Sequence, residues 1–329
     1  MIQDKALLDK EIEMYQSQVY SLKTEMGKSI IGQKHLVDSL LIALFAGGHI
    51  LLEGLPGLAK TLAIKTLGTC LGARYSRIQF TPDLLPSDVI GTMIYNQKLD
   101  EFMVKKGPIF ANLVLADEIN RAPAKVQSAL LEAMQEKQIT IGEETYPLES
   151  PFLVMATQNP LEQEGTYTLP EAQLDRFLLK VRVDYPSMEE EIKIIRQPYE
   201  EKSGQPNSSL NLSNILHGRE LVHSVFMEES LENYIVQIVV ATRKPDQFGL
   251  KNLVNLISYG SSPRGSLGLS IASRAYAFLY GRSYVIPEDI QKVSLDVLRH
   301  RIGLTYEAEA ENYSVDKILT DIINTIPVP

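Results

Sequence analysis

Residues 50–61 read Ile-Leu-Leu-Glu-Gly-Leu-Pro-Gly-Leu-Ala-Lys-Thr, and this stretch decides the fold. An apolar run, Ile50 to Leu52, leads into a loop from Gly54 to Thr61, and a helical pattern continues to Leu71. A strand, a glycine-rich loop and a helix in this order form the setting of a phosphate-binding loop. Glycines let backbone N–H groups turn toward phosphates, and the helix N-terminus adds the positive end of its dipole. The alternative is a strand-to-helix turn without a ligand, which the Lys-Thr pair disfavours.

The loop predicts specific contacts with a nucleoside triphosphate. Lys60 is expected to reach the β- and γ-phosphates, and Thr61 is expected to ligate Mg²⁺. Ala59 stands where the usual pattern has glycine; alanine is small and is expected to be helical there, so the departure is mild. The residues expected to bind the nucleotide are Gly54, Leu55, Pro56, Gly57, Leu58, Ala59, Lys60, Thr61, Leu62 and Asp117.

Outward from the loop, short apolar runs alternate with helical stretches. The runs are Ile50–Leu52, Tyr75–Phe80, Leu113–Ala116, Phe152–Ala156 and Phe177–Val183. Such an alternation predicts an α/β fold with a parallel sheet that helices cover on both faces. Two segments depart from it, Met93–Phe110 around Asp100-Glu101 and Gln138–Pro151 around Gly142-Glu143. Both are predicted to be β-hairpins inserted into the core.

The flanking regions are predicted to be helical. Apolar residues at steps of four and three indicate a helix over residues 5–28, and a second amphipathic helix follows from Leu36 to Phe45. Near Pro186 the character changes, because Ser187 and Glu190 form a capping box that opens a helix. We therefore predict an N-terminal helix (1–30), an α/β core (31–186) and a helical domain (187–329).

The run Leu113-Val-Leu-Ala-Asp-Glu118 ends in two acids at the carboxyl edge of a strand. Ligands bind at that edge in parallel α/β sheets. Asp117 is expected to help hold Mg²⁺ through water, and Glu118 to polarise the attacking water as a general base. A strand that runs into Asp-Glu is weak evidence by itself, but downstream of a phosphate-binding loop it becomes specific.

Three further residues are candidates with a plain alternative each. Asn159 ends another apolar strand and is expected to contact the γ-phosphate or the attacking water, although Asn-Pro is also a turn dipeptide. Arg176 is a candidate arginine finger, with a surface salt bridge as the alternative. Arg264 heads a helix of the second domain and is a candidate nucleotide sensor or a solvated arginine.

Composition narrows the class of protein. The 329 residues carry a net charge of −9, which disfavours binding nucleic acid or anionic membrane over the whole surface. Cys70 is the single cysteine, so an internal disulfide is impossible. The N-terminus lacks the pattern of a signal peptide, and the longest apolar run, Leu40 to Phe45, is too short to span a bilayer. We therefore expect a cytoplasmic protein without membrane insertion.

Taken in order, the motifs resemble those of the AAA+ ATPases, and most closely those of the MoxR family. The strings that carry the resemblance are GLPGLAKT (54–61), QFTPDLLPSDVIG (79–91), GPIFANLVLADEINRAP (107–123), MATQNPLEQEGTYTLPEAQLDRF (155–177) and SSPRG (261–265). The resemblance covers nearly the whole chain from about Ile31 onward. It departs from the family pattern at Ala59 and in the N-terminal helix.

The resemblance implies a five-stranded α/β core, two hairpin insertions shared with magnesium-chelatase subunits and MCM helicases, and a helical lid. It implies ATP and Mg²⁺ as cofactors and a homo-oligomeric ring, usually a hexamer. Arg176 would then act on the nucleotide of a neighbouring subunit, and Arg264 matches the sensor of the lid. Relatives of this kind remodel or activate other proteins or metalloenzyme complexes, often with a partner that carries a von Willebrand factor A domain.

Three alternatives remain open at this stage. A nucleic-acid motor is disfavoured by the net charge and by the acidic hairpin tip Gly142-Glu-Glu-Thr145. A chelatase-type metal-insertion subunit would share the same motor, although the histidines lack the spacing of metal ligands. A non-hydrolysing switch predicts a damaged catalytic set, whereas Lys60, Asp117 and Glu118 are all present.

Overall fold

The computed structural model describes residues 2–159, 165–196 and 210–329. The chain divides into two compact units. An α/β unit comprises Gln18–Phe177 and Val181–Leu216. A helical unit comprises Met1–Ser17, Leu178–Lys180 and His217–Pro329. The predicted boundary near residue 186 remains a prediction.

The centre of the α/β unit is a five-stranded sheet with the strand order β2-β5-β8-β1-β9. The strands are β1 (Ile50–Glu53), β2 (Tyr75–Gln79), β5 (Leu113–Asp117), β8 (Leu153–Gln158) and β9 (Leu179–Arg182). β2, β5, β8 and β1 pair in parallel. The interior strands β1, β5 and β8 are buried nearly throughout, as expected for strands covered on both faces. The predicted parallel five-stranded core is confirmed.

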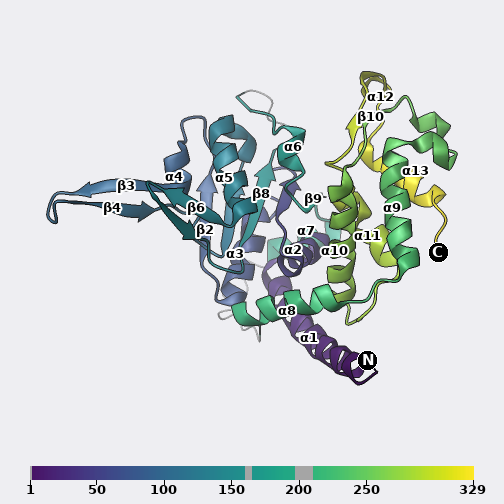
Figure 1. Ribbon diagram of the computed structural model, residues 1–329, viewed down its shortest axis with the longest axis horizontal. Coiled ribbons are helices and arrows are strands. Elements are labelled where there is room, and N and C mark those ends of the chain that lie inside the picture. The colour runs from purple at the N-terminus through teal and green to yellow at the C-terminus, as the bar shows by residue number, and fades with distance from the viewer. Residues whose placement is uncertain (1, 160–164, 197–209) are drawn as a thin grey trace. The chain divides into compact units, whose positions relative to one another are not determined.

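Helices cover this sheet (Figure 1). The helices of this unit that bury side chains include α2 (Lys34–Ala46), α3 (Lys60–Leu71), α4 (Pro86–Ile90) and α5 (Ala124–Glu136), whereas α6 (Glu171–Leu174) and α7 (Met188–Arg196) have no buried residue. α5 shows why they pack: Val126, Leu130 and Met134 recur at helical spacing and are buried in the core. The predicted capping box also opens α7, because the Ser187 N–H donates to Glu190 Oε2 at 2.9 Å and the Glu190 N–H donates to Ser187 Oγ at 3.3 Å.

The register of the sheet brings several strand ends to one edge. Gln79 pairs with Asp117, Ala116 with Ala156, and Glu53 with Gln158. Since all these strands run in the same direction, the residues that follow them emerge at the same carboxyl edge. The loop after β1 and the acids after β5 are thereby placed on one side of the unit.

Both predicted hairpins are present. The first consists of β3 (Gly91–Asn96) and β4 (Glu101–Lys106), and it projects from the unit as a long ribbon (Figure 1). The second consists of β6 (Gln138–Ile141) and β7 (Glu144–Pro147).

The second unit is mainly helical. Its helices are α9 (Glu229–Arg243), α10 (Pro263–Leu279), α11 (Pro287–Leu298), α12 (Tyr306–Ala310) and α13 (Val315–Thr325). Two helices, α1 (Ile2–Ser29) and α8 (Leu212–Ser224), contribute residues to both units, as does the strand β9. A short antiparallel ribbon of β10 (Ile257–Tyr259) and β11 (Gly303–Leu304) joins these helices, a feature that the sequence patterns do not predict. The described residues include no helix with the length and apolar character needed to cross a membrane.

Candidate functional site

The loop between β1 and α3 turns sharply before the helix begins. Gly57 has φ +86°, a backbone conformation that glycine adopts without strain. Ala59 precedes the first residue of α3 and has φ +56° and ψ +14°. The expectation that Ala59 is helical is therefore wrong, because the chain must pass through the left-handed region to enter the helix. For a residue with a side chain this conformation costs about 1–2 kcal/mol.

Lys60 opens α3 and is held across the loop. Its Nζ donates to the carbonyl oxygen of Gly54 at 2.6 Å. Burial lowers the pKa of the Lys60 ammonium, while the carboxylates of Asp117 and Glu118 act in the opposite direction. The loop thus combines a cationic side chain with the backbone N–H groups of the first helical turn, which have no partner within the helix.

Asp117 ends β5 with both carboxylate oxygens in contact with donors. Thr157 Oγ1 donates to Oδ1 at 2.7 Å, and Arg77 Nη2 and Nε lie 2.5 Å and 3.1 Å from Oδ2. The Asp117 side chain is only 14% exposed. Its carboxylate is therefore fixed in orientation by two neighbouring strands, β8 and β2.

Glu118, the next residue, is held through both its backbone and its side chain. Its N–H donates to Thr157 Oγ1 at 2.9 Å, and its φ of +55° is again left-handed. Gln79 Nε2 and Arg121 Nη1 donate to its Oε2 at 2.8 Å and 3.0 Å. The left-handed backbone turns the chain away from the strand direction of β5 directly after Asp117.

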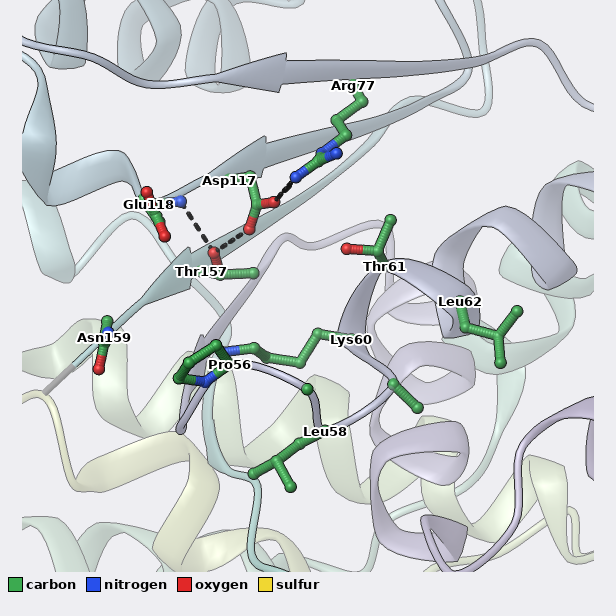
Figure 2. A pocket seen from close by; sticks show the side chains of 12 residues that line it. Pro56, Leu58, Lys60, Thr61, Leu62, Arg77, Asp117, Glu118, Thr157 and Asn159 are labelled. Carbon is green, nitrogen blue, oxygen red and sulfur yellow. Dashed lines mark hydrogen bonds and ion pairs between the residues drawn. The ribbon is translucent and has the colours of Figure 1, made fainter. Parts of the chain in front are cut away.

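These groups share one cavity of about 420 Å³. Figure 2 shows the loop and the first turn of α3 on one side, with Asp117, Thr157 and Asn159 across from them. The lining residues are Pro56, Gly57, Leu58, Ala59, Lys60, Thr61, Leu62, Arg77, Asp117, Glu118, Thr157 and Asn159. Most of the residues predicted to bind a nucleotide are thus brought together. Gly54 and Leu55 line an adjoining cavity of about 320 Å³, which Leu58 also borders.

Two predicted site residues lie elsewhere. Arg176 is absent from the described lining of both cavities, and its Nη1 donates to the carbonyl oxygen of Leu131 at 2.9 Å. Arg264 belongs to the helical unit, where it stands in the first turn of α10 and its N–H donates to Ser262 Oγ at 3.2 Å. The first cavity therefore assembles the loop, the acids and Asn159 without these arginines.

Sequence reasoning missed four residues of this site: Arg77, Gln79, Arg121 and Thr157. Thr157 bonds both acids, although its motif drew attention only to Asn159. Arg77 and Gln79 alternate along β2 and so share a face. These two polar residues at alternate positions of the predicted strand Tyr75–Phe80 were the signal that the sequence offered.

The donor set suits one kind of ligand. A lysine, unpaired helical N–H groups and a glycine-containing turn favour a polyphosphate. The hydroxyl of Thr61 and the carboxylate of Asp117 are hard oxygen ligands of the type that Mg²⁺ prefers. The fold and this site define a P-loop ATPase of the AAA class.

Comparison with known proteins agrees with this class. Residues 49–179 match the model of the ATPase family associated with various cellular activities (AAA), and residues 254–322 match that of the AAA lid domain. Chaperone MoxR1 of Mycobacterium tuberculosis is 50% identical over 305 residues, which is 93% of this chain and 81% of the relative. Protein MoxR of Paracoccus denitrificans is 30% identical over 98% of this chain and 99% of its own. The crystal structure of a proposed ATPase from Cytophaga hutchinsonii superposes with a TM-score of 0.92, at 49% identity, over the whole of both chains.

The chain belongs to the MoxR family of AAA+ ATPases. It is accordingly a nucleotide-binding ATPase with a core and a lid, and a chaperone-like protein by family. The alternatives of a chelatase subunit and a nucleic-acid motor are not favoured by these relatives.

Proposed function

We propose that this chain hydrolyses Mg²⁺-bound ATP in the cavity beside the loop and uses the energy to remodel or activate other proteins. The observation that carries the proposal is the meeting of Lys60, Thr61, Asp117, Glu118 and Asn159 in that one cavity. A cation, two acids and an amide around one cavity are the parts that phosphoryl transfer to water requires.

Each side chain has a proposed role. The loop from Gly54 to Leu62 cradles the phosphates, with Lys60 on the β- and γ-phosphates. Thr61 and Asp117 hold Mg²⁺, which supplies neutralisation of phosphate charge when bound. Glu118 takes a proton from the attacking water, and Asn159 orients that water toward the γ-phosphorus. The adjoining cavity, where Leu55, Leu58 and Tyr185 lie with the charged residues Glu53, Arg182 and Asp184, is the proposed space for the base of the nucleotide.

The two arginines outside the cavity are proposed to act from an assembled ring. We propose a hexamer in which Arg176 of one subunit stabilises the charge on a neighbour's transferred phosphoryl group. That role fits an arginine which does not line the cavity of its own chain. Arg264 is proposed to sense the nucleotide from the lid, and a protein with a von Willebrand factor A domain is the proposed partner. We expect the ring to work in the cytoplasm, where ATP is supplied.

The test is ATP hydrolysis measured against protein concentration for the native chain, Glu118→Gln and Arg176→Ala. Turnover per chain should rise with concentration as rings form. Glu118→Gln should bind ATP yet lose about 10²–10⁴-fold in turnover, because the general base is gone. Arg176→Ala should bind ATP and remain slower by about 10³-fold or more at every concentration.

A matched control is Arg74→Ala, which removes an exposed arginine paired with Glu149 outside the cavity. It should keep native turnover. Hydrolysis that is independent of both concentration and Arg176 would contradict the shared site, and absence of hydrolysis in the native chain would contradict the ATPase mechanism as a whole.

A further inference from the structure

Arg77 occupies a position that the family motifs do not explain. It lies on β2 and lines the cavity together with Lys60 and both acids. β2 runs parallel to β5 in a register that pairs Gln79 with Asp117. Arg77 and Gln79, two residues apart, point to the same face of β2 and so lie beside the end of β5.

The guanidinium of Arg77 contacts Asp117 through two nitrogens. Nε and Nη2 both donate to Oδ2, at 3.1 Å and 2.5 Å, while Oδ1 accepts from Thr157 Oγ1. Figure 2 shows Arg77 and Thr157 on opposite sides of the carboxylate. Asp117 is therefore held between two strands rather than by its own backbone alone.

The same guanidinium reaches Glu118 through Gln79. Arg77 Nη2 donates to Gln79 Oε1 at 2.9 Å, and Gln79 Nε2 donates to Glu118 Oε2 at 2.8 Å. A guanidinium can only donate, so it fixes which end of the Gln79 amide faces it. The amide must then turn its N–H₂ toward Glu118. Arg77 thus sets the orientation of a donor on the second acid without touching that acid.

An ordinary surface pair, formed by the residue that precedes β2, offers a contrast. Arg74 Nη1 lies 2.6 Å from Glu149 Oε1, with both side chains largely exposed at 66% and 48%. Arg77 is half-exposed, yet its partner Asp117 is 14% exposed, and the guanidinium serves two acceptors at once. An exposed pair such as Arg74–Glu149 contributes little to stability. A planar guanidinium that donates to two acceptors, as in Arg77, fixes the orientation of both acceptors.

We propose that Arg77 is a positioning residue that holds both acids of the site, Asp117 directly and Glu118 through Gln79. The inference rests on the roles proposed above for these acids. It has two separable consequences. First, the cation of Arg77 neutralises the carboxylate of Asp117 and so opposes the binding of Mg²⁺ there. Second, Gln79, the other acceptor of the guanidinium, keeps Glu118 in place for the attacking water.

Three variants separate these consequences. Arg77→Ala removes both the positive charge and the hydrogen bonds of the guanidinium. Arg77→Lys keeps the charge but lacks the planar guanidinium. Gln79→Ala removes only the link to Glu118. Arg74→Ala serves as the control. For each, we would measure turnover, the affinity for a fluorescent ATP analogue with and without Mg²⁺, the Mg²⁺ concentration that half-saturates analogue binding, and the thermal unfolding midpoint.

Arg77→Ala should lose about 10- to 100-fold in turnover, because the acids are no longer held in the productive orientation. Its Mg²⁺ requirement should fall by about threefold or more, since a competing cation is gone, and its affinity for metal-free analogue should weaken. Arg77→Lys and Gln79→Ala should both lose turnover while keeping the native Mg²⁺ requirement. A merely structural arginine would not move the Mg²⁺ requirement in this direction.

Native turnover in Arg77→Ala overturns the proposal. A loss of turnover with an unchanged Mg²⁺ requirement in that variant also overturns it. These outcomes are distinct from failure of the proposed function, in which the native chain and Arg74→Ala would themselves bind no analogue or hydrolyse no ATP.

Discussion

The two inserted hairpins have the same topology but opposite surroundings. In the β6–β7 hairpin, Ile139 and Ile141 are 6% and 5% exposed and belong to the core of the α/β unit. In the β3–β4 hairpin, Ile94, Tyr95 and Phe102 are 44%, 50% and 68% exposed. The first is anchored by one apolar face, whereas the second carries apolar side chains into solvent.

The sequences of the hairpins explain this difference. Gln138-Ile-Thr-Ile141 alternates strictly, so a single face is apolar and can be buried. Met93-Ile-Tyr95 places apolar residues at consecutive positions, so both faces of the ribbon are apolar and the core can cover neither fully. Apolar side chains that gather on an exposed ribbon are unusual, because the solvent-facing side chains of a hairpin are ordinarily polar. The hairpins therefore differ in what they contribute to stability.

The largest expected effect is a difference between two identical substitutions. Ile141→Ala should lower the free energy of unfolding by about 2–4 kcal/mol, because it removes a buried side chain and leaves a cavity. Ile94→Ala, on the exposed ribbon, should cost less than about 1 kcal/mol. Urea unfolding followed by circular dichroism measures both. Equal losses in the two variants would contradict the contrast between the hairpins.

An intermediate effect is expected at the turns. Gly142 has φ +65°, and a Cβ there would meet Met93 Sδ at 2.5 Å, so Gly142→Ala should cost about 1–2 kcal/mol. Asp100 has a similar φ of +56° at the other turn but already bears a side chain, which accepts a hydrogen bond from Tyr95 Oη. Asp100→Gly exchanges relief of that strain for loss of an exposed bond, so it should change stability by less than about 1 kcal/mol. The same unfolding measurement compares the two variants. A larger loss of stability in Asp100→Gly than in Gly142→Ala would contradict this expectation.

The smallest expected effect lies at the most exposed of these aromatic residues. Phe102→Ser should leave the free energy of unfolding within about 0.5 kcal/mol of the native value, since little surface is buried there. It should reduce the fluorescence of a dye that binds exposed apolar surface. Lys98→Ser, in the same hairpin, is the control and should keep the dye signal. A stable Phe102→Ser variant with unchanged fluorescence would show that the aromatic side chain is not open to the dye.

Features that depend on neighbouring positions in the chain were predictable. The Ser187–Glu190 capping box was predicted and found, because its partners lie three residues apart. The core strands and both hairpins were predicted for the same reason, since period and turn residues are local properties. Lys60, Thr61 and Glu118 were identified as candidates because each lies in a contiguous motif next to a strand, and the structure brings them to one cavity.

Features that depend on the order of strands were not predictable. Arg77 joins the site only because β2 is the neighbour of β5, an arrangement that no local pattern in Tyr75–Gln79 specifies.

The left-handed backbone of Ala59 was missed because the small side chain suggested a helix, whereas the direction of entry into α3 determined the conformation. The roles of Arg176 and Arg264 depend on assembly and remain predictions.

The strand order also sets the distance between the loop that follows β1 and the acids that follow β5. β8 lies between β1 and β5, so the loop that follows β1 and the acids that follow β5 are separated by two interstrand spacings, or roughly 9–10 Å. Peptide hydrogen bonds set that span, and side chains have no part in it. Substitutions inside these strands can soften the core, but they leave the gap unchanged as long as the sheet persists. The distance between the loop and the acids is therefore set by the backbone, while the side chains determine the chemistry that takes place between them.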